Sequence, residues 1–200
     1  TLAAVHDQRR DRGLHIGVVR ADVDGHRRLF RGRRGVRASV HPVDSSCTPI
    51  EGAQVDIWHC DAQGVYSGVS DQGFETTGQK FLRGYQLTDG TGKVQFLTIY
   101  PGWYSGRAVH IHFTIRTTGA DSNDYQFTSQ FFFDDVLTDQ VYTLEPYASK
   151  GQRNVRNTDD NIFNSGGDQL LLNLQGDNTN GYTSAINIGL DLGVISPTLF

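Results

Sequence analysis

The residues of this sequence best suited to chemistry lie in one short run, in which a tyrosine and an arginine precede two histidines: Tyr104, Arg107, His110 and His112. Residues 109–115 alternate in polarity and are rich in β-branched types, which predicts a strand. Successive side chains of a strand point to opposite faces, so His110 and His112 share one face, about 7 Å apart along it. Two imidazoles in that relation can bind a single metal ion.

A His-x-His pair also fits a plainer interpretation, in which two polar side chains occupy the solvent face of a half-buried strand. The neighbouring tyrosine and arginine favour the chemical interpretation. A Pro-Gly-Trp-Tyr turn precedes the predicted strand and could return the phenol of Tyr104 toward the histidines.

The composition predicts a single, mainly β domain. Two hundred residues can bury a substantial core, and the chain holds 23 Gly, 8 Tyr, 11 Phe and no Met. No apolar run approaches the ~20 residues of a membrane span, so we expect a soluble chain without a membrane partner. Short strands separated by turn signals favour a β-sandwich with long loops and one or two short helices.

Several segments are specific enough to be assigned an element. Strands are expected at residues 15–19, 36–43, 53–58, 81–88, 93–99, 109–115, 125–133, 170–174 and 182–190. Residues 89–92 should join two of them as a hairpin, and residues 138–146 should form a short helix that Pro146 ends. Phe127, Phe131 and Phe133 are expected in the core, and Tyr100 is a candidate for a structural role, with the rim of the site as the alternative.

Charge divides the chain unevenly. Residues 1–37 hold ten Arg and four Asp, whereas residues 38–200 hold eight basic and eighteen acidic residues. We therefore expect an Arg/Gly-rich leader at 1–37, largely loop, followed by one β-sandwich domain at 38–200. The leader has few aromatic residues and no recognisable reading motif, and the body is acidic, so we expect no nucleic-acid partner.

The sequence contains two cysteines, Cys47 and Cys60. Their spacing suits a disulfide between neighbouring strands in an oxidising compartment, and the alternative is two buried free thiols. We expect the disulfide, and with it a secreted, extracellular protein.

Five runs resemble, in order, the signatures of the intradiol ring-cleavage dioxygenases, the family that includes catechol 1,2-dioxygenases and protocatechuate 3,4-dioxygenases. The runs are residues 49–67, 81–86, 98–104, 107–113 and 128–133. The resemblance extends over roughly residues 49–190 and is closest to the compact, secreted bacterial members of the family.

The resemblance implies a non-haem Fe(III) centre with two tyrosine and two histidine ligands, which at the matching positions are Tyr66, Tyr104, His110 and His112. Anionic phenolate oxygens suit a hard ferric ion, whereas imidazole is a borderline donor. Because phenol has a pKa near 10, the charge of the ion itself must ionise the tyrosines. The implied substrates are a catechol-type diol and O2, and the implied product is a cis,cis-muconate.

The same resemblance assigns roles around the ligands. Tyr104 is the ligand that a catechol displaces, and so it takes part in catalysis. Arg107 matches an arginine that stabilises negative charge on the reacting ring, and Gln130 matches a glutamine that positions this arginine or the substrate. The plainer alternatives are a surface salt bridge for Arg107 and a polar strand residue for Gln130. We expect Trp103 to line the substrate pocket and Trp58 to lie in the core.

One departure and two rival functions stay open. Residues 1–48 lack the Gly-Pro-Tyr or Gly-Pro-Phe segment that covers the site in this family, which leaves the pocket cover and the contacts of an expected homodimer undefined. One rival is a zinc or copper hydrolase that adds a carboxylate, such as Asp56 or Asp61, to the histidine pair. The other is a non-catalytic transthyretin-like or carbohydrate-binding β-sandwich.

Overall fold

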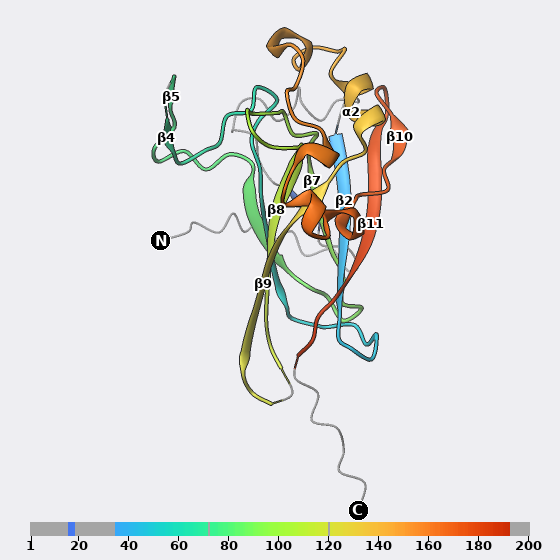
Figure 1. Ribbon diagram of the computed structural model, residues 1–200. Helices are drawn as coiled ribbons and strands as arrows, with labels where there is room; N and C mark the ends of the chain where they lie inside the picture. The colour runs from blue at the N-terminus through green and yellow to red at the C-terminus, as the bar shows by residue number, and fades with distance from the viewer. Residues whose placement is uncertain (1–15, 19–34, 72, 120, 193–200) are drawn as a thin grey trace, which may run out of the picture.

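Two β-sheets, one of five strands and one of four, enclose the core of the molecule (Figure 1). The computed structural model describes residues 16–18, 35–71, 73–119 and 121–192. The prediction of a mainly β sandwich with long loops and short helices is confirmed.

The five-stranded sheet is built from both ends of the described chain. Its order is β1 (Ile16–Val18), β7 (Val94–Ile99), β2 (Gly35–Val43), β11 (Gly181–Gly189) and β10 (Gln175–Asp177). Strand β2 lies at its centre, antiparallel to β7 and parallel to β11.

The four-stranded sheet is antiparallel throughout and carries the histidine pair. Its order is β6 (Arg83–Leu87), β3 (Gln54–Trp58), β8 (His110–Thr118) and β9 (Asp124–Phe132). A small hairpin of β4 (Ser70–Asp71) and β5 (Phe74–Glu75) projects from the body in Figure 1.

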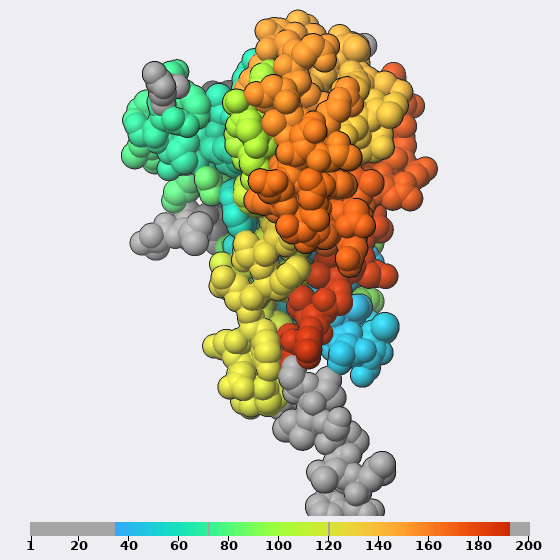
Figure 2. All heavy atoms as spheres, viewed as in Figure 1, coloured from blue at the N-terminus to red at the C-terminus, as the bar shows by residue number. Residues whose placement is uncertain are grey.

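Helical segments lie between the last strands. They are α2 (Asp135–Val141) and the 3-10 turns η1 (Ala148–Lys150), η2 (Asn157–Asp159), η3 (Phe163–Ser165) and η4 (Gly167–Leu170). Figure 2 shows the orange segment that contains η2 to η4 lying across the front of the molecule. None of the helices in the described part of the chain has the length and apolar content that a membrane crossing requires.

Alternation along the strands sends one set of side chains of each sheet into the core. In β8, Ile111, Phe113 and Ile115 are almost fully buried, and the ring of Phe113 stacks on that of Phe131 with centroids 4.1 Å apart. Burying a side chain of this size contributes about 1.5–3 kcal/mol to stability. The intervening residues of β8, which include both histidines, therefore face the opposite side of the sheet.

Part of the arginine-rich leader belongs to the five-stranded sheet. Strand β1 confirms the short strand predicted within residues 15–19, and it pairs in parallel with β7. Strand β2 begins at Gly35, inside the segment expected to be loop. The remaining residues of the leader lie outside the described residues, and the division at residue 37 stays a prediction.

The predicted hairpin of residues 81–99 is wrong, although its turn forms. Gly92 N–H donates to Asp89 O at 2.8 Å, and Asp89 N–H donates to Lys93 O at 3.0 Å. Strand β6 nevertheless pairs with β3, and β7 pairs with β2 in the other sheet. The turn residues encode a reversal of the chain, but strand partners depend on which apolar faces must be buried.

The predicted disulfide is also wrong, because both cysteines are free. Cys47 is exposed in a turn, with a backbone φ of 61°. Cys60 is buried, and its thiol donates to Gly102 O at 3.3 Å. The support that a disulfide would give to an extracellular location is therefore absent, and that location stays a prediction.

Three further predictions, all in the second half of the chain, are wrong. Residues 170–174 form no strand, since only a single bridge joins Leu171 to Phe132. Helix α2 ends at Val141, well before Pro146. Phe127 is 39% exposed because β9 is buried only over its last three residues, and this ring lines a groove of about 450 Å³ between β9, η3–η4 and β11.

Tyr100 lies in the core instead of at the rim of the site. It is fully buried, and its hydroxyl lies 2.8 Å from Thr138 Oγ1 on α2.

His59 gives the fold a specific pH dependence. Its ring is fully buried, with Nδ1 2.8 Å from Cys60 O and Nε2 2.7 Å from Thr98 Oγ1. Burial lowers its pKa from 6.5 to about 4, so the unfolded chain binds a proton between these pH values that the folded chain does not. Stability is thus retained above pH 6.5 and lost as the pH falls toward 4.

We expect the free energy of unfolding to fall by about 1.4 kcal/mol more per pH unit in the wild type than in His59→Gln across this window. Urea titrations of both proteins at pH 6.5, 5.5 and 4.5 measure the difference. Parallel pH profiles would contradict a neutral, buried His59.

Candidate metal centre

Four side chains converge on the outer face of the four-stranded sheet: Tyr66, Tyr104, His110 and His112. His110 Nε2 lies 3.1 Å from His112 Nε2, 3.2 Å from the Tyr104 hydroxyl and 3.4 Å from the Tyr66 hydroxyl. The structure thus brings together all four residues that the sequence selected as ligands.

The histidines are held by the register of β8. His110 lies opposite Phe132 of β9, and His112 lies between Trp58 of β3 and Gln130 of β9. His110 Nδ1 donates to Ala108 O at 2.7 Å, which leaves the lone pair of this ring on Nε2, the nitrogen that faces the other three donors. This arrangement is the one a metal-binding histidine needs.

Tyr66 lies on a loop whose backbone is held both before and after this residue. The hydroxyl of Thr76 donates to Tyr66 O at 2.7 Å, and the guanidinium of Arg83 donates to Ser67 O at 2.8 Å. Before it, Gly64 has φ 78° and approaches Trp103 so closely that a Cβ would lie 2.0 Å from Trp103 O. This close approach brings the loops of the two tyrosines together.

Tyr104 follows a turn that packs on the same loop. Gly102 N–H donates to Asp61 O at 2.9 Å. The rings of Tyr66 and Tyr104 consequently meet edge to face, with centroids 5.6 Å apart.

Burial keeps all four side chains neutral in the absence of a positive charge. Together with the charges of neighbouring groups such as Arg107, it lowers the pKa of His110 to about 4 and that of His112 to about 3. It also raises the pKa of Tyr66 and Tyr104. Two imidazole lone pairs and two phenol oxygens around one point fit a cation, because a cation would both accept the lone pairs and ionise the phenols.

Carboxylates do not complete the set. Within the described ranges of the chain, no three His, Cys, Asp or Glu side chains form a group that could hold a metal. The side-chain oxygens that approach His110 Nε2 to within 3.4 Å are the hydroxyls of Tyr104 and Tyr66.

Arg107 and Gln130 lie side by side next to these donors. Arg107 donates through Nη2 to Gln130 Oε1 at 2.5 Å and through Nε to Asp160 Oδ2 at 2.9 Å. The role suggested for Gln130, that of positioning Arg107, agrees with this contact.

One of the two tryptophans lies elsewhere than expected, whereas the pocket role of Trp103 stays a prediction. Trp58 lies outside the core and stacks on the ring of His112, with centroids 4.9 Å apart and planes 2° apart. The indole N–H of Trp103 donates to Gly151 O at 3.1 Å, and Lys150 Nζ lies 4.8 Å from its ring.

Two residues near the site were missed by the sequence analysis. The alternation of β3 could have identified Trp58, since it falls on the face opposite Val55 and Ile57. No local pattern identifies Asp160, which lies in a polar loop far along the chain from Arg107.

Comparison with known proteins gives a consistent family. A protein-family model described as "Dioxygenase" matches residues 25–159. A chlorocatechol 1,2-dioxygenase of Pseudomonas putida is 26% identical over 137 residues, which cover 59% of this chain and 47% of the relative. That of Rhodococcus opacus is 32% identical over 120 residues, covering 50% and 42%. The chain spans about half the length of the curated relatives it matches.

Solved structures agree. An intradiol ring-cleavage dioxygenase from Tetranychus urticae is 27% identical with a TM-score of 0.72, over 94% of this chain and 92% of that one. The dioxygenase domain of a Streptomyces dioxygenase–carbohydrate-binding fusion, at 22% identity and a TM-score of 0.59, covers 96% of this chain and 100% of its own and shares the fold. The match of the family model over more than half of the chain shows that this protein belongs to the intradiol ring-cleavage dioxygenase family.

Proposed function

We propose that this chain opens the ring of catechol-type diols between the two hydroxyl-bearing carbons, using O2 and a non-haem Fe(III) ion, and releases a cis,cis-muconate. The observation that carries the proposal is the approach of two phenol oxygens and the Nε2 of His112 to within 3.4 Å of His110 Nε2, in a chain of this family. The relatives named chlorocatechol 1,2-dioxygenase support the same class of substrate.

Tyr66, Tyr104, His110 and His112 would hold the ferric ion. Phenolate oxygens suit this hard ion, and two of them offset most of its charge at a half-buried site. When bound, the ion would draw electron density from the coordinated diol and so make a ring carbon open to attack by O2.

The other residues would prepare and stabilise the reacting diol. Tyr104, which lies outside the strands, would make way for the diol, and its phenolate oxygen would take up a proton from a diol hydroxyl. Arg107, held by Gln130, would stabilise the negative charge on the ring. Trp58 would keep the His112 ring in plane through its stacking contact. Substrate binding by Trp103 stays a prediction. Its indole N–H donates to Gly151 O, so only the ring face or edge could contact a diol.

No observation favours a zinc or copper hydrolase. The carboxylate of Asp56 pairs with Arg116, and that of Asp61 accepts from the backbone N–H groups of Gln63 and Val65. Membership of the dioxygenase family also argues against a non-catalytic sandwich. A homodimer, an extracellular location and the lack of a nucleic-acid partner stay predictions of the sequence.

The direct test is oxygen uptake by iron-loaded protein with a panel of diols: catechol, chlorinated catechols and protocatechuate. A muconate-type product, formed with one O2 consumed per diol, is the expected result. A yellow semialdehyde would mean that the ring bond next to the two hydroxyl-bearing carbons is cleaved, and it would contradict the proposal. No O2 uptake with any member of the panel, at full iron loading, would refute the proposal.

Replacing Tyr104 with phenylalanine is expected to shift or bleach the burgundy absorption of tyrosinate-bound iron, because one of two phenolate donors is lost. The measurement is the visible spectrum of protein with known iron content. Tyr100→Phe is the matched control, since this buried tyrosine bonds to Thr138 and not to the site, and its spectrum should equal that of the wild type. An unchanged band in Tyr104→Phe would remove that residue from the coordination shell.

A further inference from the structure

Asp160 has an unusual number of fixed partners for a carboxylate beside a candidate metal centre. Its Oδ2 accepts from Arg107 Nε at 2.9 Å and from Ala108 N at 2.8 Å. Its Oδ1 accepts from Ile162 N at 2.8 Å and from Phe163 N at 3.2 Å. The side chain is 1% exposed, so four hydrogen bonds in a buried environment define where this charge lies.

Arg107 is consequently held from two directions. Asp160 takes its Nε–H, and Gln130 Oε1, from β9, accepts from Nη2 at 2.5 Å. A guanidinium has five N–H donors in one plane, so fixing two of them fixes the direction of the rest. The remaining N–H donors are available to the site. Burial raises the pKa of Tyr104, and the charge of Arg107 beside it lowers this pKa.

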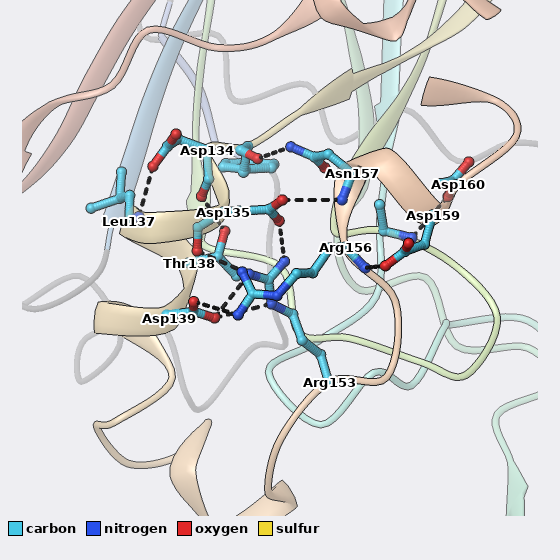
Figure 3. Close-up of polar contacts among 12 residues, drawn as sticks. Asp134, Asp135, Leu137, Thr138, Asp139, Arg153, Arg156, Asn157, Asp159 and Asp160 are labelled. Atoms are coloured by element: carbon cyan, nitrogen blue, oxygen red, sulfur yellow. Dashed lines mark hydrogen bonds and ion pairs between the residues drawn. The ribbon is translucent and has the colours of Figure 1, made fainter. Parts of the chain in front are cut away.

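The segment that carries this carboxylate is itself anchored. Figure 3 shows residues 153–160 against α2, joined by ion pairs and hydrogen bonds. Arg153 is 3% exposed and pairs with Asp135 and, at 2.8 Å, with Asp139. Asn157 N–H donates to Asp135 Oδ2 at 3.2 Å. The carboxylate beside the site therefore comes from a braced segment and not from a free loop.

We propose that Asp160 is a positioning residue for Arg107: its carboxylate sets the orientation in which the remaining N–H donors of the guanidinium meet negative charge on the reacting diol. Without this acceptor, the guanidinium would lose the contact that holds its Nε–H, and its plane could turn about the contact with Gln130. The inference rests on the proposed function, since it concerns how Arg107 acts in the same reaction.

Asp160→Asn tests the inference with little change in shape. An amide can accept on one side only, so the N–H donors on one side lose their acceptor, and the negative charge is removed in both cases. The donors are Arg107 Nε and Ala108 N on one side, and Ile162 N and Phe163 N on the other. We expect kcat to fall about 10-fold to 100-fold, as for other residues that orient groups at metal sites, with KM little changed. The visible absorption band should keep its position, because the four proposed ligands are untouched.

A double-mutant cycle separates positioning from simple structural support. If Asp160 acts through Arg107, then Asp160→Asn should lower kcat in the wild-type background and have no further effect in an Arg107→Ala background. An equal loss in both backgrounds would overturn the proposal, and so would an unchanged kcat in Asp160→Asn. If Asp160→Asn does not fold, Asp160→Glu is carried through the same cycle with the same expectation.

The matched control is Asp56→Asn. It also removes an aspartate charge that pairs with an arginine, here Arg116, but within the four-stranded sheet and away from Arg107. Its kcat should equal that of the wild type. Failure of the proposed function is distinguishable, because it would appear as absence of diol cleavage by the wild type itself, before any variant is compared.

Discussion

Replacing His112 with alanine is expected to empty the metal centre and to lower diol cleavage by more than about 100-fold, beyond what the loss of an orienting partner costs. His112 Nε2 lies 3.1 Å from His110 Nε2, and no other described His, Cys, Asp or Glu side chain completes a group that could replace it. The variant would also lose the stacking contact with Trp58. Iron per chain and the visible band measure the effect directly, independently of activity.

His41→Ala provides the comparison for this variant. His41 lies on β2 in the other sheet and is partly buried, so its removal tests the general cost of losing a half-buried imidazole. It should leave iron content at the level of the wild type. Full iron content in His112→Ala would exclude His112 as a ligand.

Gly102→Ala is expected to destabilise the fold by about 3 kcal/mol, at the upper end of the usual cost of overpacking. A Cβ at this position would lie 2.5 Å from the carbonyl oxygens of both Asp61 and Ala62. Backbone atoms cannot rotate out of the way as a side chain can, so the turn before Tyr104 would have to separate from the loop before Tyr66. We therefore expect weaker iron binding together with the loss of stability.

Urea unfolding and iron content of Gly102→Ala, compared with Gly189→Ala, measure this effect. No atom lies within 4 Å of a Cβ built at Gly189, and that variant should match the wild type in both properties. Equal stability of the two variants would show that the turn at Gly102 can move without cost.

Three of the four candidate ligands could be predicted from the sequence because their arrangement is local. A strand places His110 and His112 on one face by its two-residue period, and the run from Tyr104 to His112 is short. Tyr66 was accessible only through the family resemblance, since nothing in its own loop indicates that it will meet β8. The contacts of Gly64 and Gly102, which bring the two loops together, depend on distances between backbones that no single segment specifies.

Long-range partners account for most of what was not predicted. Apart from residues 170–174, the predicted strand positions in the body agree with the structure to within a few residues. The predicted pairing of β6 with β7 does not, because a turn signal carries no information about sheets. Trp58 was misplaced because tryptophan is more often buried in a core than stacked on a polar ring. The bond between Asp160 and Arg107 joins segments 53 residues apart, and only the folded arrangement reveals it.

The parallel pairing of β2 with β11 has a consequence for biosynthesis. These two strands lie at opposite ends of the described chain and meet along eight consecutive residue pairs at the centre of the five-stranded sheet. A ribosome must therefore release almost all of the described polypeptide before that sheet can close, and until then one edge of β2 is open to other chains. We therefore expect the nascent protein to be most prone to aggregation in that interval.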